Sequence, residues 1–579
     1  MTKTSASRCL VGEGVSPGIG YGRIWRGGAD LTDGADYTPG AQAEEKARLH
    51  AAAQTAAKQM RERSESLRGQ GEQAAADIME AHALLAEDPL LLGAVEKELT
   101  VQGDDANAPK AVHTAAEAQA AVLAALEDPY IRERAADVRS VGKALVKALL
   151  GKEEAPPPDG TLILAGDDAA PAAFDALPPD RIGGMIFIRG SRTSHAAILA
   201  RAKGIPAVTG LGETLGEAAE GELVIVDGNA GRVTIAPSAA ELEAAKNAVR
   251  QWQEKCHAVA ALASETTVTT DGCLVTLCGN VGSIADVAAA MAAGADSIGL
   301  LRSEFLFRSR ETFPTEEEQY AAYRDAVEAA RGRCCVIRTL DAGADKSIPA
   351  LHLPTEANPA LGQRAIRLSL ARPALLKSQL RAILRAGSAG AVGILLPLVV
   401  NREEIVAVKE ILAEVKEDLA ASHIPYAGHA PLGLTVETPA AAIMSERLAK
   451  EVDFFSIGTN DLTQYTLAAD RTNPAADALG SYFHPAVLRL IEQTAKAGEA
   501  AGIPVTICGE MASDPLALPL ILGMGIKILS MDAASLLWLR AAVHRLSRKK
   551  ARHLWEHVKT MGDAADIRAY VAAEMEQDA

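Results

Sequence analysis

The carboxyl-terminal half of the chain repeats one pattern, a short apolar run followed by a segment of helix length. From Thr267 onward, eight candidate strands follow one another, at residues 275–278, 298–301, 336–339, 393–396, 432–436, 454–457, 505–507 and 528–531. Apolar runs that alternate with helices are typical of a parallel sheet. Eight such units in roughly 310 residues predict a closed (β/α)₈ barrel, the TIM barrel.

Polar side chains follow the carboxyl ends of these strands, where a barrel of this type carries its chemistry. They are Asn280, Arg302, Glu304, Arg338, Asp341, Glu437, Asn460, Asp461, Cys508 and Glu510. A purely structural barrel gives no reason for charge to gather at one rim. We therefore expect this rim to be the functional end.

Arginines dominate the cations of this predicted rim. Arg302 and Arg338 end the second and third strands, so they should lie side by side. Further cations follow in the later loops, namely Lys346, Arg364, Arg367 and Arg471. Guanidinium groups bind carboxylates and phosphates with two parallel hydrogen bonds. A chain with a formal net charge of −17 must gather its cations locally if it binds an anion, and these residues do so.

Two carboxylates and a thiol end later strands. Glu437 and Asp461 end the fifth and sixth, and such hard oxygen ligands beside a phosphate site suit Mg²⁺. Zinc is disfavoured because no cluster of His and Cys accompanies them. Cys508 ends the seventh strand. Most free cysteines are inert core residues, but a thiol at a barrel mouth could move a proton at a carbon next to a carbonyl.

Residues 190–208 predict a helix of little more than two turns outside the barrel. Thr193 and Ser194 are good N-cap residues, and Pro206 is a good stop signal. His195 then falls in the first turn, where free backbone N–H groups and the helix dipole favour a phosphate. The imidazole could carry a phosphoryl group there, or it could be an ordinary capping or surface histidine.

The amino-terminal half reads as a β-rich unit interrupted by helices. Residues 9–26 predict short strands broken by glycine turns, and their glycine spacing fits no nucleotide-binding loop. Residues 41–150 are alanine-rich with helical periodicity and predict a bundle. Strand character returns at 161–165, 185–188, 222–226 and 232–235, the last two joined as a hairpin. We infer one α/β domain with the bundle inserted.

Acidic residues outnumber basic ones in the predicted bundle. The prominent ones are Glu80, Glu87, Asp88, Glu96, Glu98, Asp104, Asp105, Glu127 and Asp128. They could form a solvated face or a docking face for a basic partner. Residues 237–263 predict one amphipathic helix after the second β segment, either a swivel arm or an ordinary linker.

Composition limits the possible classes of protein. The length of 579 residues predicts about three or four domains. The fractions of hydrophobic residues (48%) and charged residues (23%) are ordinary for a globular protein. The chain has no apolar run long enough to span a membrane, and its first residues lack the apolar core expected of a signal peptide. Its negative charge argues against nucleic-acid binding. Seven scattered cysteines without a Cys-x-x-Cys pair indicate a reducing compartment, so we expect a cytoplasmic protein.

Nine segments, in order along nearly the whole chain, resemble one family. They are residues 128–139, 193–201 (Thr-Ser-His-Ala-Ala-Ile-Leu-Ala-Arg), 299–307, 314–319, 338–346, 358–367, 436–441 (Val-Glu-Thr-Pro-Ala-Ala), 453–465 and 508–512 (Cys-Gly-Glu-Met-Ala). They resemble Enzyme I, the phosphoenolpyruvate–protein phosphotransferase of the bacterial sugar phosphotransferase system. Two positions depart from the family, which commonly has glycine at Ser191 and often has methionine at Thr435. Neither touches an assigned catalytic group.

The resemblance implies a reaction and roles for the residues. Phosphoenolpyruvate, with Mg²⁺, would phosphorylate His195, and the phosphoryl group would then pass to a histidine of the carrier protein HPr, as the first step of sugar uptake. The substrate-binding residues would be Arg302, Arg338, Asn460, Asp461 and Arg471. Glu437 and Asp461 would hold the metal, and Cys508 would protonate the enolate to pyruvate. Four residues would support the site, namely Thr193, Ser194, Lys346 and Arg364.

The resemblance also implies a domain plan and a homodimer joined through the barrels. The expected segments are 1–33 and 151–237 (phosphohistidine domain), 34–150 (helical HPr-binding domain), 238–265 (linker helix) and 266–579 (phosphoenolpyruvate-binding and dimerisation barrel).

Two other functions are compatible with parts of this pattern. Pyruvate phosphate dikinase and phosphoenolpyruvate synthase share the histidine domain and barrel, but they need a nucleotide-binding domain for which about 110 helical residues leave too little room. A non-catalytic relay would bind the carrier without turnover, and it would not need all of these polar residues together.

Overall fold

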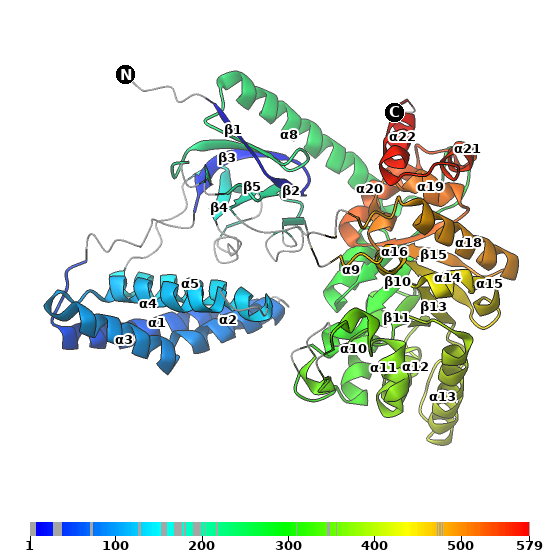
Figure 1. Ribbon diagram of the computed structural model, residues 1–579, viewed down its shortest axis with the longest axis horizontal. Coiled ribbons are helices and arrows are strands. Elements are labelled where there is room, and N and C mark those ends of the chain that lie inside the picture. The colour runs from blue at the N-terminus through cyan, green and yellow to red at the C-terminus, as the bar shows by residue number, and fades with distance from the viewer. Residues whose placement is uncertain are drawn as a thin grey trace. The chain divides into compact units, whose positions relative to one another are not determined.

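The computed structural model describes two compact units, Met1–Glu254 and Lys255–Ala579 (Figure 1). Within them it describes residues 7–26, 37–69, 73–124, 129–151, 159–166, 177–178, 181–188, 197, 200–201, 203–212, 214–215, 218–308, 310–343, 348–354, 356–471, 473, 476 and 479–577. Among these residues, no helix combines the length and the apolar character that a bilayer crossing requires.

The first unit contains a mixed eight-stranded sheet of order β1-β8-β7-β3-β4-β5-β6-β2. Its strands are β1 (Arg8–Val11), β2 (Glu13–Ser16), β3 (Ile19–Trp25), β4 (Leu162–Gly166), β5 (Ile182–Phe187), β6 (Ala207–Thr209), β7 (Leu223–Asp227) and β8 (Arg232–Ile235). β3, β4, β5 and β6 run parallel, while β7 and β8 form the predicted antiparallel hairpin. Because strands from before and after the helical block share one sheet, the block is an insertion, as predicted.

Several glycines of residues 9–26 lie inside strands, which corrects the prediction that they form turns. Gly14 belongs to β2, and Gly20 and Gly22 to β3. A Cβ atom on Gly20 would lie 1.6 Å from the carbonyl oxygen of Gly183, so only glycine allows this approach of two backbones. Gly18, with φ of +116°, does lie in the predicted kind of turn.

The inserted block is the predicted helical bundle. Its helices are α1 (Gln42–Gly69), α2 (Gln73–Ala86), α3 (Pro89–Gln102), α4 (Ala108–Ala124) and α5 (Pro129–Leu150), with a 3₁₀ turn, η1 (Gly103–Asp105). Asp88 ends the preceding turn, and its carboxylate accepts the amide hydrogen of Leu90 at 2.8 Å, capping α3. Helices α4 and α5 pack closely at Gly142, since a Cβ atom there would lie only 2.7 Å from that of Ala116.

Helix α8 (Ala239–Ala260) and the 3₁₀ turn η4 (Ala261–Ser264) follow β8 and match the predicted amphipathic helix. Ala245 and Val259 are buried, and Leu242, Val249, Trp252 and Cys256 are half-buried between exposed neighbours. The apolar stripe therefore lies along one face.

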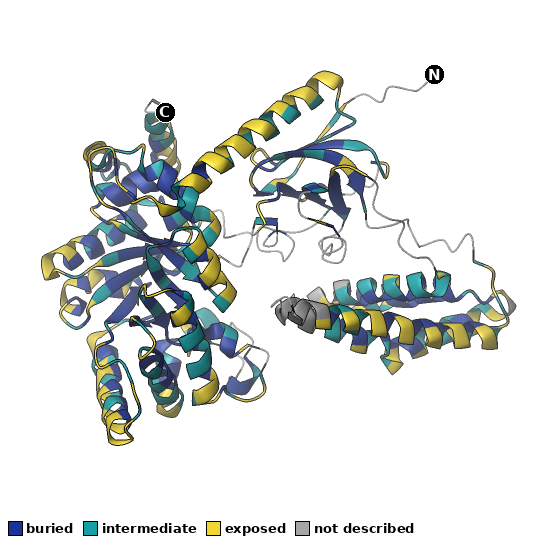
Figure 2. Ribbon diagram, turned by 180° about the vertical axis from the view of Figure 1, so that it is seen from behind, coloured by how far each residue is buried: buried dark blue, intermediate teal, exposed yellow. Residues whose placement is uncertain are grey.

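The second unit is a closed barrel of eight parallel strands. The strands are β9 (Thr276–Val281), β10 (Ser297–Arg302), β11 (Cys335–Arg338), β12 (Val392–Leu396), β13 (Leu432–Val436), β14 (Phe454–Gly458), β15 (Val505–Cys508) and β16 (Ile528–Met531). All eight were predicted from the sequence. Figure 2 shows these strands in the colour of buried residues, as expected for strands that helices cover.

Helices and 3₁₀ turns connect the strands and follow the last one. They are α9 (Ile284–Ala292), η5 (Ser303–Leu306), α10 (Glu316–Ala329), η6 (Pro349–Leu351), η7 (Pro359–Leu361), α11 (Ile366–Ala371), α12 (Pro373–Ala386), α13 (Arg402–Ala421), α14 (Pro439–Ile443), α15 (Ser445–Leu448), α16 (Thr459–Leu467), α18 (Pro485–Ala501), η8 (Glu510–Ser513), α19 (Leu518–Gly523), α20 (Ala533–Val543), α21 (Arg548–Val558) and α22 (Ala564–Gln577). Capping boxes begin α10 at Thr315 and α13 at Asn401.

Candidate active site at the barrel mouth

Two arginines end adjacent strands at the carboxyl-terminal rim of the barrel. Arg302 of β10 and Arg338 of β11 are paired in register, as predicted. Arg338 is only 7% exposed, whereas Arg302 is exposed at the rim. Neighbouring protein nevertheless displaces water around Arg302, and this desolvation, with the charge of Arg338, lowers its pKa.

Buried carboxylates hold the Arg338 guanidinium in place. Its Nη2 donates to Glu304 Oε1 at 2.9 Å and lies 3.1 Å from Asp341 Oδ2, while Nη1 lies 3.8 Å from Glu437 Oε1. Burial opposes the charge of Arg338, but the three carboxylates outweigh it and raise the pKa. Sequence reasoning placed Glu304 and Asp341 at the rim without recognising them as the partners that orient this arginine.

Arg364 is a second buried cation of the same network. Its Nη2 donates to Asp341 Oδ1 at 2.9 Å, and its Nη1 donates to the Tyr465 hydroxyl at 3.2 Å. Nη1 also lies 3.7 Å from Asp461 Oδ1. The network therefore joins β11 to helix α16, whose first turn contains Asp461. Tyr465 was missed from the sequence because nothing in its motif indicates a hydrogen-bond partner on the 341–364 loop.

Glu437 and Asp461 are buried carboxylates, and the charge of Asp461 acts on Glu437. Burial first, and then the charges of Asp461 and Asp341, raise the pKa of Glu437 to about 8. A Cβ atom on Gly458 would lie 2.8 Å from Glu437 Oε1, so the glycine before α16 leaves room for this carboxylate. Oδ1 of Asp461 is buried and accepts no hydrogen bond from the described residues.

These two carboxylates fit a divalent cation. Asp461 Oδ1 is buried without a hydrogen-bond donor among the described residues, and Mg²⁺ usually takes one or two protein carboxylates and completes its shell with substrate oxygens and water. Among the residues that the structure describes, no three His, Cys, Asp or Glu residues are grouped as a metal cage. The donor set therefore suits a metal shared with a substrate rather than one held by protein alone.

Cys508 ends β15 with its side chain buried. Its Sγ accepts a hydrogen bond from the Ser456 hydroxyl at 3.2 Å and donates one to the carbonyl of Ile457 at 3.3 Å. Burial raises the pKa of this thiol to about 11, against the opposing effect of Ser456. The group is therefore protonated at neutral pH and can donate a proton.

Asn460 and Arg471 complete the described part of the rim. The Asn460 Oδ1 atom accepts the amide hydrogen of Glu510 at 3.0 Å, which ties the start of α16 to the loop after Cys508. Arg471 Nη2 lies 3.7 Å from Asp461 Oδ2, and its side chain is 45% exposed. This leaves Arg471 donors available to a ligand.

Some predicted residues cannot be placed. Thr193, Ser194 and His195 lie outside the described residues, as do Lys346 and the departure Ser191. The other departure, Thr435, is buried in β13 two residues before Glu437, and its hydroxyl has no hydrogen-bond partner among the described residues.

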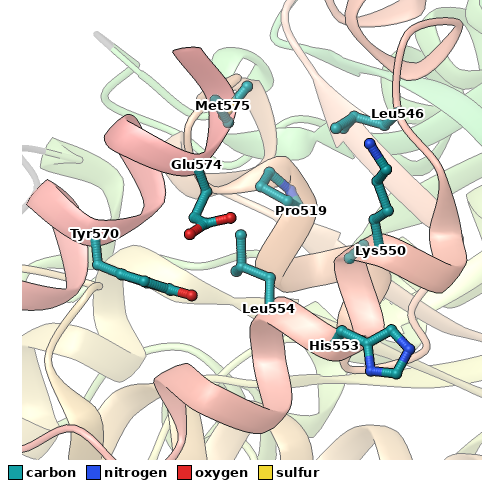
Figure 3. A pocket seen from close by; sticks show the side chains of 9 residues that line it. Pro519, Leu546, Lys550, His553, Leu554, Tyr570, Glu574 and Met575 are labelled. Carbon is teal, nitrogen blue, oxygen red and sulfur yellow. The ribbon is translucent and has the colours of Figure 1, made fainter. Parts of the chain in front are cut away.

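A cavity of about 330 Å³ lies elsewhere, between α19, α21 and α22. Figure 3 shows side chains that line it, among them Tyr570 and Glu574 of α22 and Lys550 of α21. It is also lined by Leu546, whose carbonyl accepts the amide hydrogen of Thr270 just before β9. The cavity is therefore at the amino-terminal end of the barrel, away from the rim residues.

Three protein-family models match this chain. They describe PEP-utilising enzymes, as the N-terminal part (residues 11–134), the mobile domain (158–231) and the PEP-binding domain (257–548). A solved structure described as an NMR solution structure of Enzyme I (nEIt) is 29% identical, covers 42% of this chain and 99% of its own, and has a TM-score of 0.31.

Full-length relatives carry one name. The phosphoenolpyruvate-protein phosphotransferase of Geobacillus stearothermophilus is 40% identical over 530 residues, which is 91% of this chain and 91% of the relative. The protein of the same name from Bacillus subtilis (strain 168) is 39% identical over 505 residues, covering 86% and 87%. Identity of this extent across the bundle, the mixed sheet and the barrel means that this chain is an enzyme of the phosphoenolpyruvate-protein phosphotransferase family.

Proposed function

We propose that this enzyme moves the phosphoryl group of phosphoenolpyruvate to its own His195 and then to a histidine of the carrier protein HPr, with release of pyruvate. This would be the first step of sugar uptake by the phosphotransferase system. The observation that supports it best is the barrel mouth, where fixed arginines, two buried carboxylates and a protonated thiol lie together.

The substrate would bind through Arg302, Arg338, Asn460, Asp461 and Arg471. Arg338 is pre-oriented by Glu304 and Asp341, so little side-chain entropy is lost when it meets an anion. Arg302 and Arg471 remain accessible and would close on the carboxylate and phosphate. Arg364 supports the site through its bond to Asp341, and Lys346 is proposed as a further cation.

Glu437 and Asp461 would hold Mg²⁺. The metal would supply positive charge to the phosphoryl oxygens. The protein positions Glu437, since Oε2 of this residue accepts the amide hydrogen of Leu398 at 2.9 Å.

The chemical step moves one phosphoryl group and one proton. The bond between phosphorus and the enol oxygen breaks, and phosphorus bonds to the His195 nitrogen far from the backbone, with Thr193, Ser194 and the helix amides receiving its oxygens. The enolate left behind takes the Sγ proton of Cys508 at carbon 3 and becomes pyruvate. Burial keeps that proton on the thiol until the enolate forms.

HPr would dock on the helical bundle, near the α2–α3 junction. Leu84, Leu90 and Val122 are 63%, 78% and 65% exposed, and Gln119 of α4 donates to the Leu90 carbonyl. Exposed apolar side chains of this kind mark interaction surfaces.

The predicted acidic face contributes less charge than its sequence indicates. Glu80 and Glu87 pair with Arg61, and Glu96 lies near Lys46 and His50. The remaining acids, with Asp88 at the junction, would attract a basic carrier.

The finer domain plan is also proposed. Segments 1–33 and 151–237 would form the phosphohistidine domain, 34–150 the HPr-binding domain, 238–265 the linker helix and 266–579 the dimerising barrel. Exposed apolar side chains on the barrel, Leu361, Ile443 and Leu479, support a homodimer contact there. All seven cysteines are free, which supports a reducing cytoplasm as the place of action.

Labelling with ³²P-phosphoenolpyruvate and Mg²⁺ tests the function. We expect acid-labile label on the native protein and none on His195→Ala, while His113→Ala, which removes an exposed histidine of α4, labels normally. Label on His195→Ala would refute the assignment of this histidine. Label from ATP instead of phosphoenolpyruvate would favour a dikinase or synthase, and carrier binding without pyruvate production would favour a relay.

A further inference from the structure

Arg540 of α20 is a buried arginine bonded to three separate segments of the second unit. It is 1% exposed, and its Nη1 donates to the carbonyls of Leu262 and Ala263 in η4, both at 2.8 Å. Its Nη2 donates to the Gly294 carbonyl after α9, and its Nε donates to the Thr267 hydroxyl at 2.9 Å. All three guanidinium nitrogens thus donate to segments around the junction where the long helix α8 enters the barrel.

Two of the acceptors, the Leu262 and Ala263 carbonyls, lie in the turn that ends α8, where a helix presents carbonyl groups without intrahelical partners. α8 continues into η4, and a guanidinium there neutralises the negative end of the helix dipole. Gly294 allows this contact, because a Cβ atom there would lie 1.9 Å from the Ala263 carbonyl oxygen. The same junction is tied to the end of α20 by the Thr270 amide, which donates to the Leu546 carbonyl at 2.8 Å.

The amino-terminal part of α8 belongs to the first unit. Glu241 accepts a hydrogen bond from the Ser7 hydroxyl at 3.1 Å, and Trp252 lies against Gly18, whose added Cβ would be 3.3 Å from the indole nitrogen. Residues 253–258 lie between the two attachments and are exposed, except for the half-buried Cys256. Any change of orientation between the units must be absorbed in this short stretch.

We propose that Arg540 is a positioning residue that pins the end of α8 to the barrel, so that the movement that brings His195 to the substrate pivots within residues 253–260. The inference rests on the proposed function. A pinned helix end restricts where the tethered histidine can travel and so raises its effective concentration at the barrel mouth. The site of HPr transfer lies on the first unit and does not depend on the pin.

The test compares loading and discharge in one set of variants. Loading is the single-turnover transfer of ³²P from phosphoenolpyruvate to His195. Discharge is followed in the reverse direction, as transfer of ³²P from phosphorylated HPr to His195. We expect Arg540→Met to slow loading about ten-fold or more, with transfer from HPr and affinity for phosphoenolpyruvate changed less than about two-fold. Arg540→Lys should restore part of the loading rate, because its ammonium can still reach the carbonyls.

Arg545→Met is the matched control, since the Nε of this nearby arginine donates to the Ala541 carbonyl of α20 rather than to η4. It should load at the native rate. Normal loading by Arg540→Met would overturn the inference, and so would equal loss of both transfers, which would indicate a purely structural role. Native protein that takes no label from phosphoenolpyruvate would overturn the proposed function instead.

A glycine pair tests the same junction if Arg540→Met does not fold. Both glycines have a positive φ, +78° at Gly294 and +79° at Gly332, so Gly294→Ala and Gly332→Ala cause similar backbone strain. Only at Gly294 would the added Cβ atom also collide with the Ala263 carbonyl, because no atom lies within 4 Å of the Cβ position at Gly332. We expect Gly294→Ala alone to slow loading selectively. Equal loading rates in the two variants would contradict the pin.

Discussion

Cys508 is fixed by hydrogen bonds on both sides of its sulfur, from the Ser456 hydroxyl and to the Ile457 carbonyl. Because burial raises its pKa to about 11, we expect it to act as the acid that completes pyruvate. Cys508→Ala should lower pyruvate release by about 10²–10⁴-fold, the usual size of a general-acid contribution, with phosphoenolpyruvate affinity little changed. Coupled pyruvate assays and equilibrium binding measure the two effects. Cys335→Ala, which removes another buried cysteine, is the control, and undiminished turnover by Cys508→Ala would exclude the role.

We expect Glu437 to make the stability of the barrel depend on pH. Its pKa is raised from 4.5 to about 8, so between these values the folded state holds a proton that the unfolded state has released. Without a divalent cation, the free energy of unfolding should therefore fall as pH rises through this window, by at most about 1.4 kcal/mol per pH unit. Added Mg²⁺ should reverse the trend, because it binds the deprotonated pair.

Urea unfolding at several pH values measures this slope. Glu437→Gln should lack it, and Glu403→Gln, which changes an exposed glutamate of α13, should keep it. A slope that survives in Glu437→Gln would show that other groups cause it.

Single residues of the site could be predicted where their position on a strand determines their place. Arg302 and Arg338 end neighbouring strands, so their adjacency followed from strand order. The partners Glu304 and Tyr465 could not be predicted in the same way, because they reach Arg338 and Arg364 only through the course of loops and the closure of the barrel. Their pairing is a tertiary property.

Among the elements, the bundle depends on a buried carboxylate in α1. Glu45 is fully buried and accepts hydrogen bonds from the amides of Gly40 and Ala108 at 2.9 Å and from Tyr37 at 2.7 Å. It also pairs with Arg48 at 2.7 Å. Glu45 therefore caps the start of α4 from another helix.

We expect Glu45→Ala to lower the free energy of unfolding of the bundle by about 2–3 kcal/mol, because buried amides and a hydroxyl lose their acceptor. Hydrogen exchange of the α4 amides in the full chain should report faster opening. Glu44→Ala, which truncates the exposed neighbour, should change exchange little. Equal protection in the two variants would contradict this account of α4.

Helices and strands could be predicted from the sequence where their apolar pattern extends over enough residues to be recognised. All barrel strands and the helical block follow from periodicity. β6 was missed because it has only three residues, Ala207–Thr209, and its strand character comes from pairing with β5 and β2. The glycines of β2 and β3 are predicted as turns because the sequence reveals the conformational freedom of glycine. It does not reveal that another backbone segment packs against each of these glycines.

At the scale of the whole molecule, the chain divides into two units after Glu254. His195 belongs to the first unit and the barrel mouth to the second, so the proposed reaction depends on the covalent link between the units. A protease site inserted between Glu254 and Lys255, cleaved after purification, would separate the units without changing any proposed site residue. Tethering typically gives an effective concentration near millimolar, so at micromolar protein the cleaved pair should load His195 about 10³-fold more slowly. Its rate should rise with concentration, whereas that of the intact chain should not.

Transfer from phosphorylated HPr to His195 should survive the cut, because it needs only the first unit. Chain carrying the uncleaved insertion controls for the added residues. A cleaved protein that loads at the intact rate would mean that the units associate on their own, and the linker helix with its Arg540 anchor would then be dispensable. Loss of both transfers would mean that the first unit needs the second in order to keep its fold. If a tethered His195 moves between the barrel mouth and the HPr-binding bundle, cleavage must slow loading sharply while transfer from HPr is kept.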